Sequence, residues 1–427
     1  TNSRAFNLIV LRPIYSHALA NSLVFNDNDS TRLYRTHTAG NRKTWTYSFW
    51  IKRLHLDLDQ ALFHTGAANG NFFNLAFATN NKINISTWAG AFIATTREFR
   101  DGHAWMHMVL SVDTTQSTAT DRFKLYVNGE LQTYSTNNIN STFAQNADTP
   151  VNQAQQHTIG SRNPYNTDVI LDAYLADVHF VDGTALAPTS FGETFNGVWV
   201  PKAYSGSYGN NGFKLDFADA SAPGNDVSGE NHDWSATAFT VSDQSIDSPT
   251  NNFATLSQIT MGSNNSLKIG GLTINGVYSA DLSGFTGTQF LNSGKWYWEV
   301  RANSTGTYPY IGISTQERTM LNAAGGSYFS IAWLAAGTAA SSGTSMGTIT
   351  KTNVESFGNG DVIMIAVDVD ARKLWWGENG TWSNSGNPAN GTGERASWTV
   401  NEPIVPFISG YSGQGVGTNF NFGQDSK

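Results

Sequence analysis

The sequence predicts an all-β protein that consists of two antiparallel β-sandwiches in tandem. Short segments alternate with period two, and no stretch of 12 residues shows a capped 3.6-residue period. A similar hairpin pattern occurs twice, at residues 123–131 and 373–382, and each copy turns at an Asn-Gly pair. Asn-Gly accepts the positive φ angles of a type I′ turn. An Asp-bearing strand precedes each copy, at 108–113 and 362–368. A pattern repeated this far apart favours two similar domains over one enzyme with a central active site.

Composition limits the class of protein. Charged residues make up 14% of the 427 residues, against about 25% in ordinary soluble domains, so neutral polar side chains must cover the surface. This is typical of extracellular and virion-exposed β proteins. The net charge of −8 argues against binding of nucleic acid, which requires a basic surface. The chain has no cysteine, which excludes disulfides and cysteine-ligated zinc and indicates a bacterial or viral source.

The first domain is expected at residues 21–197, after an N-terminal arm at 1–20. Arg12 and Pro13 interrupt the apolar part of the arm, so we expect it to dock on a partner rather than to act as a signal peptide. Strand spacing of 8–12 residues predicts a sandwich. The expected strands are 44–52, 61–64, 71–78, 82–88, 104–113, 123–127 and 173–181.

A bridge at residues 198–255 is expected to contain isolated strands in a background rich in Gly, Asn and Ser, and could belong to either neighbouring domain. The second domain is expected at 256–427. Its strands are predicted at 267–274, 294–300, 310–313, 361–368, 372–376, 405–408 and 418–423. No apolar run reaches the roughly 18 residues of a membrane helix, so no membrane insertion is expected.

Five phrases of the second domain resemble the SPRY domain in content and order. They are residues 294–300, 310–313, 360–368, the hairpin at 379–380 and 403–407. The first domain is similar to laminin-G, concanavalin-like or jelly-roll sandwiches, through residues 47–52, 105–109, 125–129 and 175–180. The combination resembles a group of tailed-bacteriophage proteins, through residues 22–27, 40–46, 190–193, 204–209 and 251–256. That resemblance implies a location on the virion surface, as a tail fibre or capsid decoration.

Catalysis must be considered because concanavalin-like folds include glucanases. A retaining glycosidase needs two carboxylates about 5 Å apart. The acid pairs with suitable spacing are Asp57/Asp59, Asp27/Asp29 and Asp368/Asp370. All of them lie in loop-like or turn-like sequence, and the Glu-x-Asp-x-Glu pattern of the glucanases is absent, so we interpret them as turn acids that cap backbone N–H groups. His103 and His107 have zinc-like spacing, but their segment is predicted as a strand rather than the helix that such spacing requires.

The resemblance to laminin-G domains also leaves a rim calcium site open, with Asp27, Asn28 and Asp29 or Asp177 as contributors. No other cofactor is expected. For glycan binding, the candidates are aromatic and amide side chains that we place at strand ends or in loops, with core packing as the alternative role of each aromatic residue. These candidates are Trp88, Tyr165, Trp333, Trp382, Trp398, Asn384 and Asn387.

The sequence therefore predicts a non-enzymatic structural and adhesive virion component whose loops bind host or environmental glycans. The arm and the bridge would contact other virion proteins, and a homo-oligomer is expected because phage appendages are usually oligomeric. Two alternatives remain: a carbohydrate-active enzyme of concanavalin-like fold, and a soluble SPRY protein that binds peptides.

Overall fold

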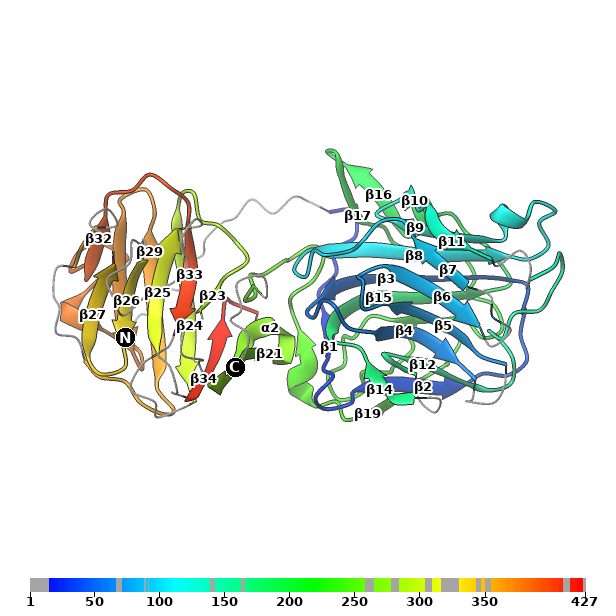
Figure 1. Ribbon diagram of the computed structural model, residues 1–427, viewed down its shortest axis with the longest axis horizontal. Helices are drawn as coiled ribbons and strands as arrows, with labels where there is room; N and C mark the ends of the chain where they lie inside the picture. Colours follow the sequence, from blue (N-terminus) through cyan, green and yellow to red (C-terminus); the bar gives the residue numbers. More distant parts are fainter. Residues whose placement is uncertain are drawn as a thin grey trace.

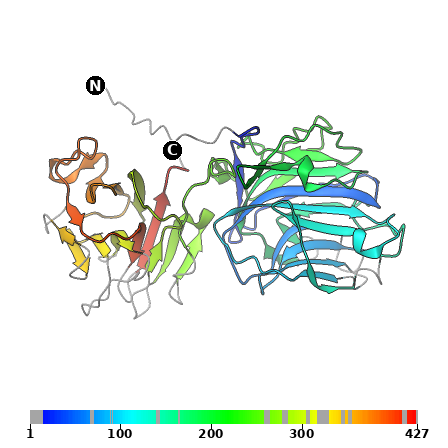
Figure 2. The ribbon, with the colours of Figure 1, turned by 90° about the horizontal axis from the view of Figure 1, so that it is seen from above.

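The computed structural model shows two β domains side by side (Figures 1 and 2). It describes residues 15–66, 71–87, 90, 92–138, 143–162, 166–257, 265–277, 284–303, 309–315, 330–342, 347–349, 355–409 and 415–424. Within these residues the secondary structure is almost entirely antiparallel strands, as predicted. None of the described helices is long and apolar enough to cross a membrane.

Two sheets face each other in the first domain. One has the order β10-β9-β8-β3-β15-β1-β20, with β18 also paired to β15, and the other has the order β11-β7-β6-β5-β4-β12-β2-β19. The strands of the first sheet are β1 (Ser22–Phe25), β3 (Thr44–Arg53), β8 (Trp105–Asp113), β9 (Phe123–Val127), β10 (Glu130–Leu131), β15 (Ala173–Asp182), β18 (Phe213–Leu215) and β20 (Gln244–Ser245). The strands of the second are β2 (Arg32–Thr36), β4 (Gln60–Thr65), β5 (Phe73–Phe77), β6 (Ile83–Thr87), β7 (Phe92–Thr95), β11 (Tyr134–Asn137), β12 (Gln156–Ile159) and β19 (Ser235–Thr237).

The core of the first domain lies between these sheets. Alternate residues of β3 point inward, and Tyr47 stacks on Phe63 of the facing sheet with 4.6 Å between ring centroids. The other face of β3 is buried too, although the sequence shows polar residues there. Two short hairpins, β16 (Gly192–Phe195) with β17 (Val198–Pro201), and β13 (Ser161–Arg162) with β14 (Asn166–Ile170), add to the sandwich. Trp199 of β17 packs with Trp50 on the outer face of β3.

The segment predicted to bridge the domains instead completes the first one. β18 pairs with β15, β19 with β2, and β20 with β1. The predicted boundary at residue 197 is therefore too early, because these two- and three-residue strands gain their stability from the sheet edges on which they pair. The described part of the arm also lies on this domain, where Leu19 packs against Trp50 and donates its backbone N–H to Thr250.

The second domain packs a large sheet against a smaller one. The large sheet has the order β21-β22-β34-β24-β29-β30-β32-β28, with β31 paired to β30, and the smaller has the order β23-β33-β25-β26-β27. The strands of the large sheet are β21 (Asn265–Lys268), β22 (Thr273–Val277), β24 (Lys295–Ala302), β28 (Gly347–Ile349), β29 (Val362–Asp368), β30 (Lys373–Glu378), β31 (Thr381–Trp382), β32 (Ala396–Trp398) and β34 (Gly415–Asn421). Those of the smaller are β23 (Gly284–Thr286), β25 (Tyr310–Thr315), β26 (Ser330–Leu334), β27 (Thr338–Ser342) and β33 (Ile404–Ser409).

The few helical turns are short. They are η1 (Ala119–Asp121), η2 (Pro188–Ser190), η3 (Val241–Asp243), α2 (Ile269–Leu272) and η4 (Ser383–Ser385). Both predicted Asn-Gly turns are confirmed: Asn128 and Gly129 have φ of 49° and 81°, and Asn379 and Gly380 have φ of 47° and 86°. The repeated hairpin is thus β9–β10 in one domain and β30–β31 in the other.

A buried ion pair fixes the segment that leads from one domain to the other. The Lys52 Nζ of β3 lies 2.8 Å from Asp247 Oδ2, and both side chains are fully buried. Lys52 also donates to the side chain of Asn252 and to the carbonyl of Phe253, while the Trp105 indole donates to the other oxygen of Asp247. Residues 247–253 are therefore held against the first domain immediately before the second begins.

Candidate functional site

Of the aromatic residues predicted to bind a ligand, two are core residues. Trp333 of β26 is fully buried and donates its indole N–H to the carbonyl of Glu355. Trp398 of β32 is 4% exposed and belongs to the same core cluster. Trp333 is the fourth residue of β26 and Trp398 is the last residue of β32. Both side chains point inward between the two sheets, which agrees with the core-packing alternative for these residues. Trp88 and Tyr165 lie outside the described residues.

Trp382, by contrast, lies on the outer face of the large sheet beside Tyr297. The two rings meet edge to face, with centroids 6.1 Å apart and planes at 72°. Tyr297 is 48% exposed, whereas Trp298 next to it in β24 points into the core. Trp382 sits opposite Gly377. A Cβ added at Gly377 would lie 3.0 Å from the Trp382 ring and 2.4 Å from Met364, so this glycine provides the space that the ring occupies.

We define the aromatic platform as Tyr297, Trp382 and the neighbouring Glu299. The Tyr297 hydroxyl donates to Glu299 Oε1. Burial and this carboxylate raise the pKa of Tyr297, so its phenol stays protonated and neutral. The platform thus offers two aromatic rings and a carboxylate on an open sheet face. Contiguous exposed apolar surface is a feature of many binding surfaces.

The predicted amide residues flank the platform in sequence. Asn384 adopts φ 57° inside η4, directly after Trp382, and Asn387 is exposed. The side-chain carbonyl of Asn387 accepts a hydrogen bond from the backbone N–H of Asn390 and so helps to form the turn at residues 387–390. Residues 383–393 cover Trp375, whose indole donates to the carbonyl of Thr392. The structure therefore places Asn384 in the turn that follows Trp382 and gives Asn387 a local structural role.

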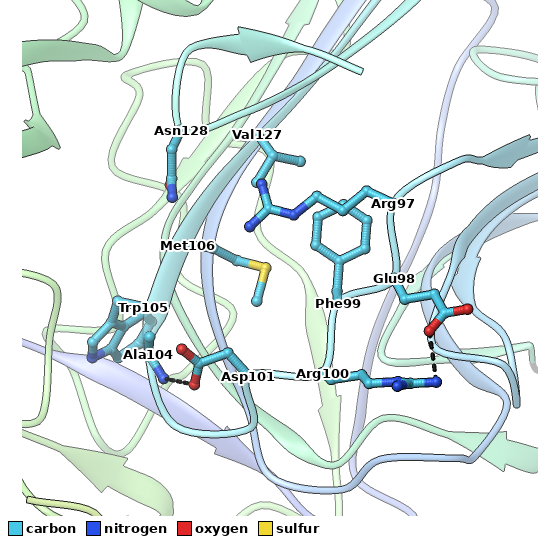
Figure 3. Close-up of a pocket in the computed structure, with 10 residues that line it drawn as sticks. All are labelled: Arg97, Glu98, Phe99, Arg100, Asp101, Ala104, Trp105, Met106, Val127 and Asn128. Atoms are coloured by element: carbon cyan, nitrogen blue, oxygen red, sulfur yellow. Dashed lines mark hydrogen bonds and ion pairs between the residues drawn. The ribbon is translucent and has the colours of Figure 1, made fainter. Parts of the chain in front are cut away.

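A small pocket in the first domain was not predicted. It lies between the loop that precedes β8 and the β9–β10 turn and has a volume of about 160 Å³ (Figure 3). Arg97 extends across it toward Val127 and Asn128, with its guanidinium 5.1 Å from the Phe99 ring centre. Asp101 lies at the opposite side, held by backbone N–H groups of His103 and Ala104. The pairing of β8 with β9 creates the pocket, so no local sequence pattern predicts it.

This pocket is smaller than the roughly 300–1,000 Å³ of usual ligand sites. It has room for one small group, such as a single sugar substituent, between a cation on one wall and a carboxylate on the other. Its floor includes the buried side chain of Met106.

The candidate catalytic acids occupy structural positions. Asp59 pairs with Arg162 at 3.1 Å, and Asp57 accepts a hydrogen bond from Asn81. Asp368 caps the N–H of Ala371. Asp370 likewise accepts the backbone N–H of residue 294. The predicted capping of a backbone N–H is found for Asp368 and Asp370, whereas the contacts of Asp59 with Arg162 and of Asp57 with Asn81 are between side chains.

The two histidines with zinc-like spacing have different hydrogen-bond partners. His103 Nδ1 lies 2.9 Å from Thr255 Oγ1, and burial lowers its pKa to about 4. His107 Nδ1 accepts the indole N–H of Trp199, and its Nε2 lies 2.8 Å from Ser48 Oγ. Because Nδ1 of His107 is an acceptor, its Nε2 carries the proton and donates to Ser48. Neither ring nitrogen of His107 is left for a metal, and Ser48 is not activated as a nucleophile.

The residues considered for calcium make contacts within the protein. Asp29 accepts the side-chain N–H of Asn26, and Asn28 donates to Asp27 Oδ1, so these groups build the β1–β2 turn. Burial alone would raise the pKa of Asp177, but His179 at 3.0 Å and the nearby Lys214 outweigh it and hold that pKa below its usual value. The Asp177 carboxylate thus already has Lys214 and His179 as partners within the protein.

Comparison with known proteins identifies both domains. Residues 25–190 match the Laminin_G_3 family, described as the concanavalin A-like lectin/glucanases superfamily, and residues 295–425 match the SPRY domain. The chain carries a concanavalin-like domain followed by a SPRY domain. Both predicted domain types are therefore confirmed, and the described all-β architecture agrees with them. No curated protein matches the chain, and neither the two family matches nor the structures named below indicate a bacteriophage origin.

Solved structures resemble parts of the chain. The SPRY domain of human HERC1 has 16% identity and a TM-score of 0.31, over 40% of this chain and 99% of that one. A heptameric SAP-like pentraxin from Limulus polyphemus has 14% identity and a TM-score of 0.30, over 40% and 78%. A putative carbohydrate binding protein from Bacteroides ovatus has 12% identity and a TM-score of 0.36, over 52% and 58%.

Proposed function

We propose that this chain is a non-enzymatic adhesive protein that binds a glycan on the aromatic platform of its SPRY domain. The observation that carries the proposal is the edge-to-face pair of the exposed Tyr297 and the half-buried Trp382. An aromatic ring packs well against the C–H face of a sugar ring, and a neighbouring carboxylate accepts hydrogen bonds from its hydroxyls. Glu299 is placed for the second role, because its Oε1 already accepts the Tyr297 hydroxyl.

The lectin-type first domain supports the same class of function, since its family description includes lectins. The pocket beside Arg97 is a second place where one sugar substituent fits. The pairing of Asp59 with Arg162, and of Asp368 and Asp370 with backbone N–H groups, supports a binding protein over a hydrolase.

We further propose that the protein is displayed on a bacteriophage virion, as a tail fibre or a capsid decoration. The phrases shared with tailed-phage proteins and the low charged fraction of 14% support this location. In that setting the arm would contact other virion proteins, and the protein would be a homo-oligomer.

Glycan-array binding of the purified full chain tests the proposed activity. Trp382→Ala and Tyr297→Ala should each weaken binding of the captured glycan by about tenfold or more, since each removes about 1.5–3 kcal/mol of apolar contact. Trp296→Ala is a matched control, because Trp296 is 41% exposed in the same strand but donates its indole to Ser293 and projects away from Tyr297. Unchanged binding in both platform variants, or failure of the wild type to bind any glycan, would refute the proposal.

Electron microscopy of particles labelled with an antibody to this chain tests the location. Label on the tail indicates a fibre, and label over the head indicates a decoration protein. Particles that carry no label would contradict a virion location.

A peptide-binding role is the second candidate, because the platform lies within residues 295–425 that match the SPRY domain. A peptide library screened with the same variants separates the two functions. Peptide capture that depends on Trp382, without glycan binding, would favour this alternative.

A further inference from the structure

Three polar side chains from separate loops meet at one end of the first sheet. Asp27 follows β1, His55 follows β3 and Asp172 precedes β15. These three strands are neighbours in the order β3-β15-β1. The register pairs residue 173 with both residue 25 and residue 53, so all three strands end at the same level. Asp27 and His55 are each two residues beyond that level and Asp172 is one, which brings their side chains together.

The distances within this cluster have the spacing of metal ligands. His55 Nδ1 lies 3.6 Å from Asp172 Oδ2 and 3.9 Å from Asp27 Oδ2, and one ligand atom of each residue lies within 4.8 Å of the others. These contacts are longer than a normal hydrogen bond. Zinc bonds of about 2.0–2.2 Å in a tetrahedron place two ligand atoms roughly 3.2–3.6 Å apart. The two distances from His55 are within a few tenths of an ångström of this spacing, and the ligand atoms of Asp27 and Asp172 are at most 4.8 Å apart, so side-chain shifts of up to about 1 Å would bring the three atoms onto one ion.

Charge balance favours a divalent cation at this point. Two carboxylates face one imidazole, so a neutral imidazole with a divalent ion makes the cluster neutral. The nearby guanidinium of Arg53 is already directed elsewhere, to the carbonyls of Phe99 and His55 and to the side chain of Asn81. The side chain of Asp172 is 7% exposed, whereas those of Asp27 and His55 are 29% and 31% exposed. The cluster thus has a buried anchor and an opening through which an ion and a water ligand can enter.

We propose that Asp27, His55 and Asp172 bind a divalent transition metal of the zinc type. The nitrogen donor distinguishes this site from calcium sites, which use oxygen ligands. One imidazole and two carboxylates suit Zn²⁺, Co²⁺ or Mn²⁺. The ion would tie together the ends of three strands and so stabilise the first domain. This inference does not depend on the glycan-binding proposal, because the platform lies in the other domain.

Isothermal titration of the EDTA-treated full chain with Zn²⁺ and with Co²⁺ is the test. We expect one site that is lost or weakened at least about 100-fold in His55→Gln and Asp27→Asn, together with visible Co²⁺ absorption in the wild type only. Asp29→Asn is the matched control, because it removes the same charge from the same turn outside the cluster. Circular dichroism in EDTA verifies that each variant is folded.

Zn²⁺ should also raise the melting temperature of the wild type but not that of His55→Gln. The proposal is overturned if both cluster variants keep wild-type affinity, since the ion then binds at another histidine. It is equally overturned if the wild type binds no transition metal, or if Ca²⁺ competes effectively with Zn²⁺.

Discussion

Acidification should unfold the first domain before the second, because buried neutral histidines occur only in the first. All nine histidines precede residue 233. His107 and His157 are buried, and burial lowers the pKa of each to about 3. Both rings also use one nitrogen as an acceptor: His107 Nδ1 accepts the Trp199 indole N–H, and His157 Nε2 accepts the backbone N–H of Asn152. A proton added to either ring would break such a bond.

The size of the effect follows from proton linkage. In the unfolded chain an imidazole titrates near 6.5, so between about pH 6.5 and pH 3 the unfolded state binds protons that the folded state does not. The free energy of unfolding is therefore not reduced by these histidines above pH 6.5, and it falls as the pH is lowered below that value. At pH 5 each of these two histidines lowers the free energy of unfolding by about 2 kcal/mol, and the pair lowers it by about 4 kcal/mol. His64 and His103, whose pKa values burial lowers to about 4, act in the same direction. A total of this size is a large part of the 5–15 kcal/mol that stabilises a typical domain.

Hydrogen exchange measured by mass spectrometry at pH 7 and pH 5 separates the domains within the intact chain. Peptides from β8 and β12 should lose protection at pH 5, with exchange times corrected for the intrinsic effect of pH. Peptides from β24 and β29 serve as the internal control and should keep their protection. Equal loss in both domains, or earlier loss in β24 and β29, would refute the reasoning.

Three further predictions concern stability. Asp247→Ala should lower the free energy of unfolding by about 3–5 kcal/mol, because it leaves Lys52 buried without its partner. Chemical denaturation measures this loss. Lys52→Met in the same background should recover part of it. Gly312→Ala should destabilise the second domain by about 1–3 kcal/mol, since its Cβ would lie 1.9 Å from the carbonyl oxygen of Ile331; equal stability of this variant and wild type in a thermal melt would contradict the strand packing. Trp333→Ala should cost about 3–5 kcal/mol in the same melt, whereas a loss below 1 kcal/mol would indicate that Trp333 is not in the core.

The sequence alone was sufficient for the local structure. Period-two alternation predicted strands, and Asn-Gly at residues 128–129 and 379–380 predicted two hairpins that the structure contains. These features depend on a few consecutive residues and on backbone preferences that act within a turn. The two domain types also followed from ordered phrases along the chain.

The candidate site could be predicted only in part. Trp382 and Trp333 were both candidates for ligand binding, yet one lies on an outer face and the other in the core. Alternation shows that the two faces of a strand differ, but not which face another sheet will cover. Tyr297 was not among the predicted site residues, because the sequence does not show which face of the strand at 294–300 another sheet covers.

What the sequence determined by itself is therefore the all-β class, the two domains and the turns. The tertiary structure decided which residues meet: the strands at 213–245 that complete the first sandwich, the ion pair of Lys52 with Asp247, and the convergence of Asp27, His55 and Asp172. These contacts join residues that are far apart along the chain. Their formation depends on strand order and register, which are set by the packing of the whole sandwich rather than by any local pattern.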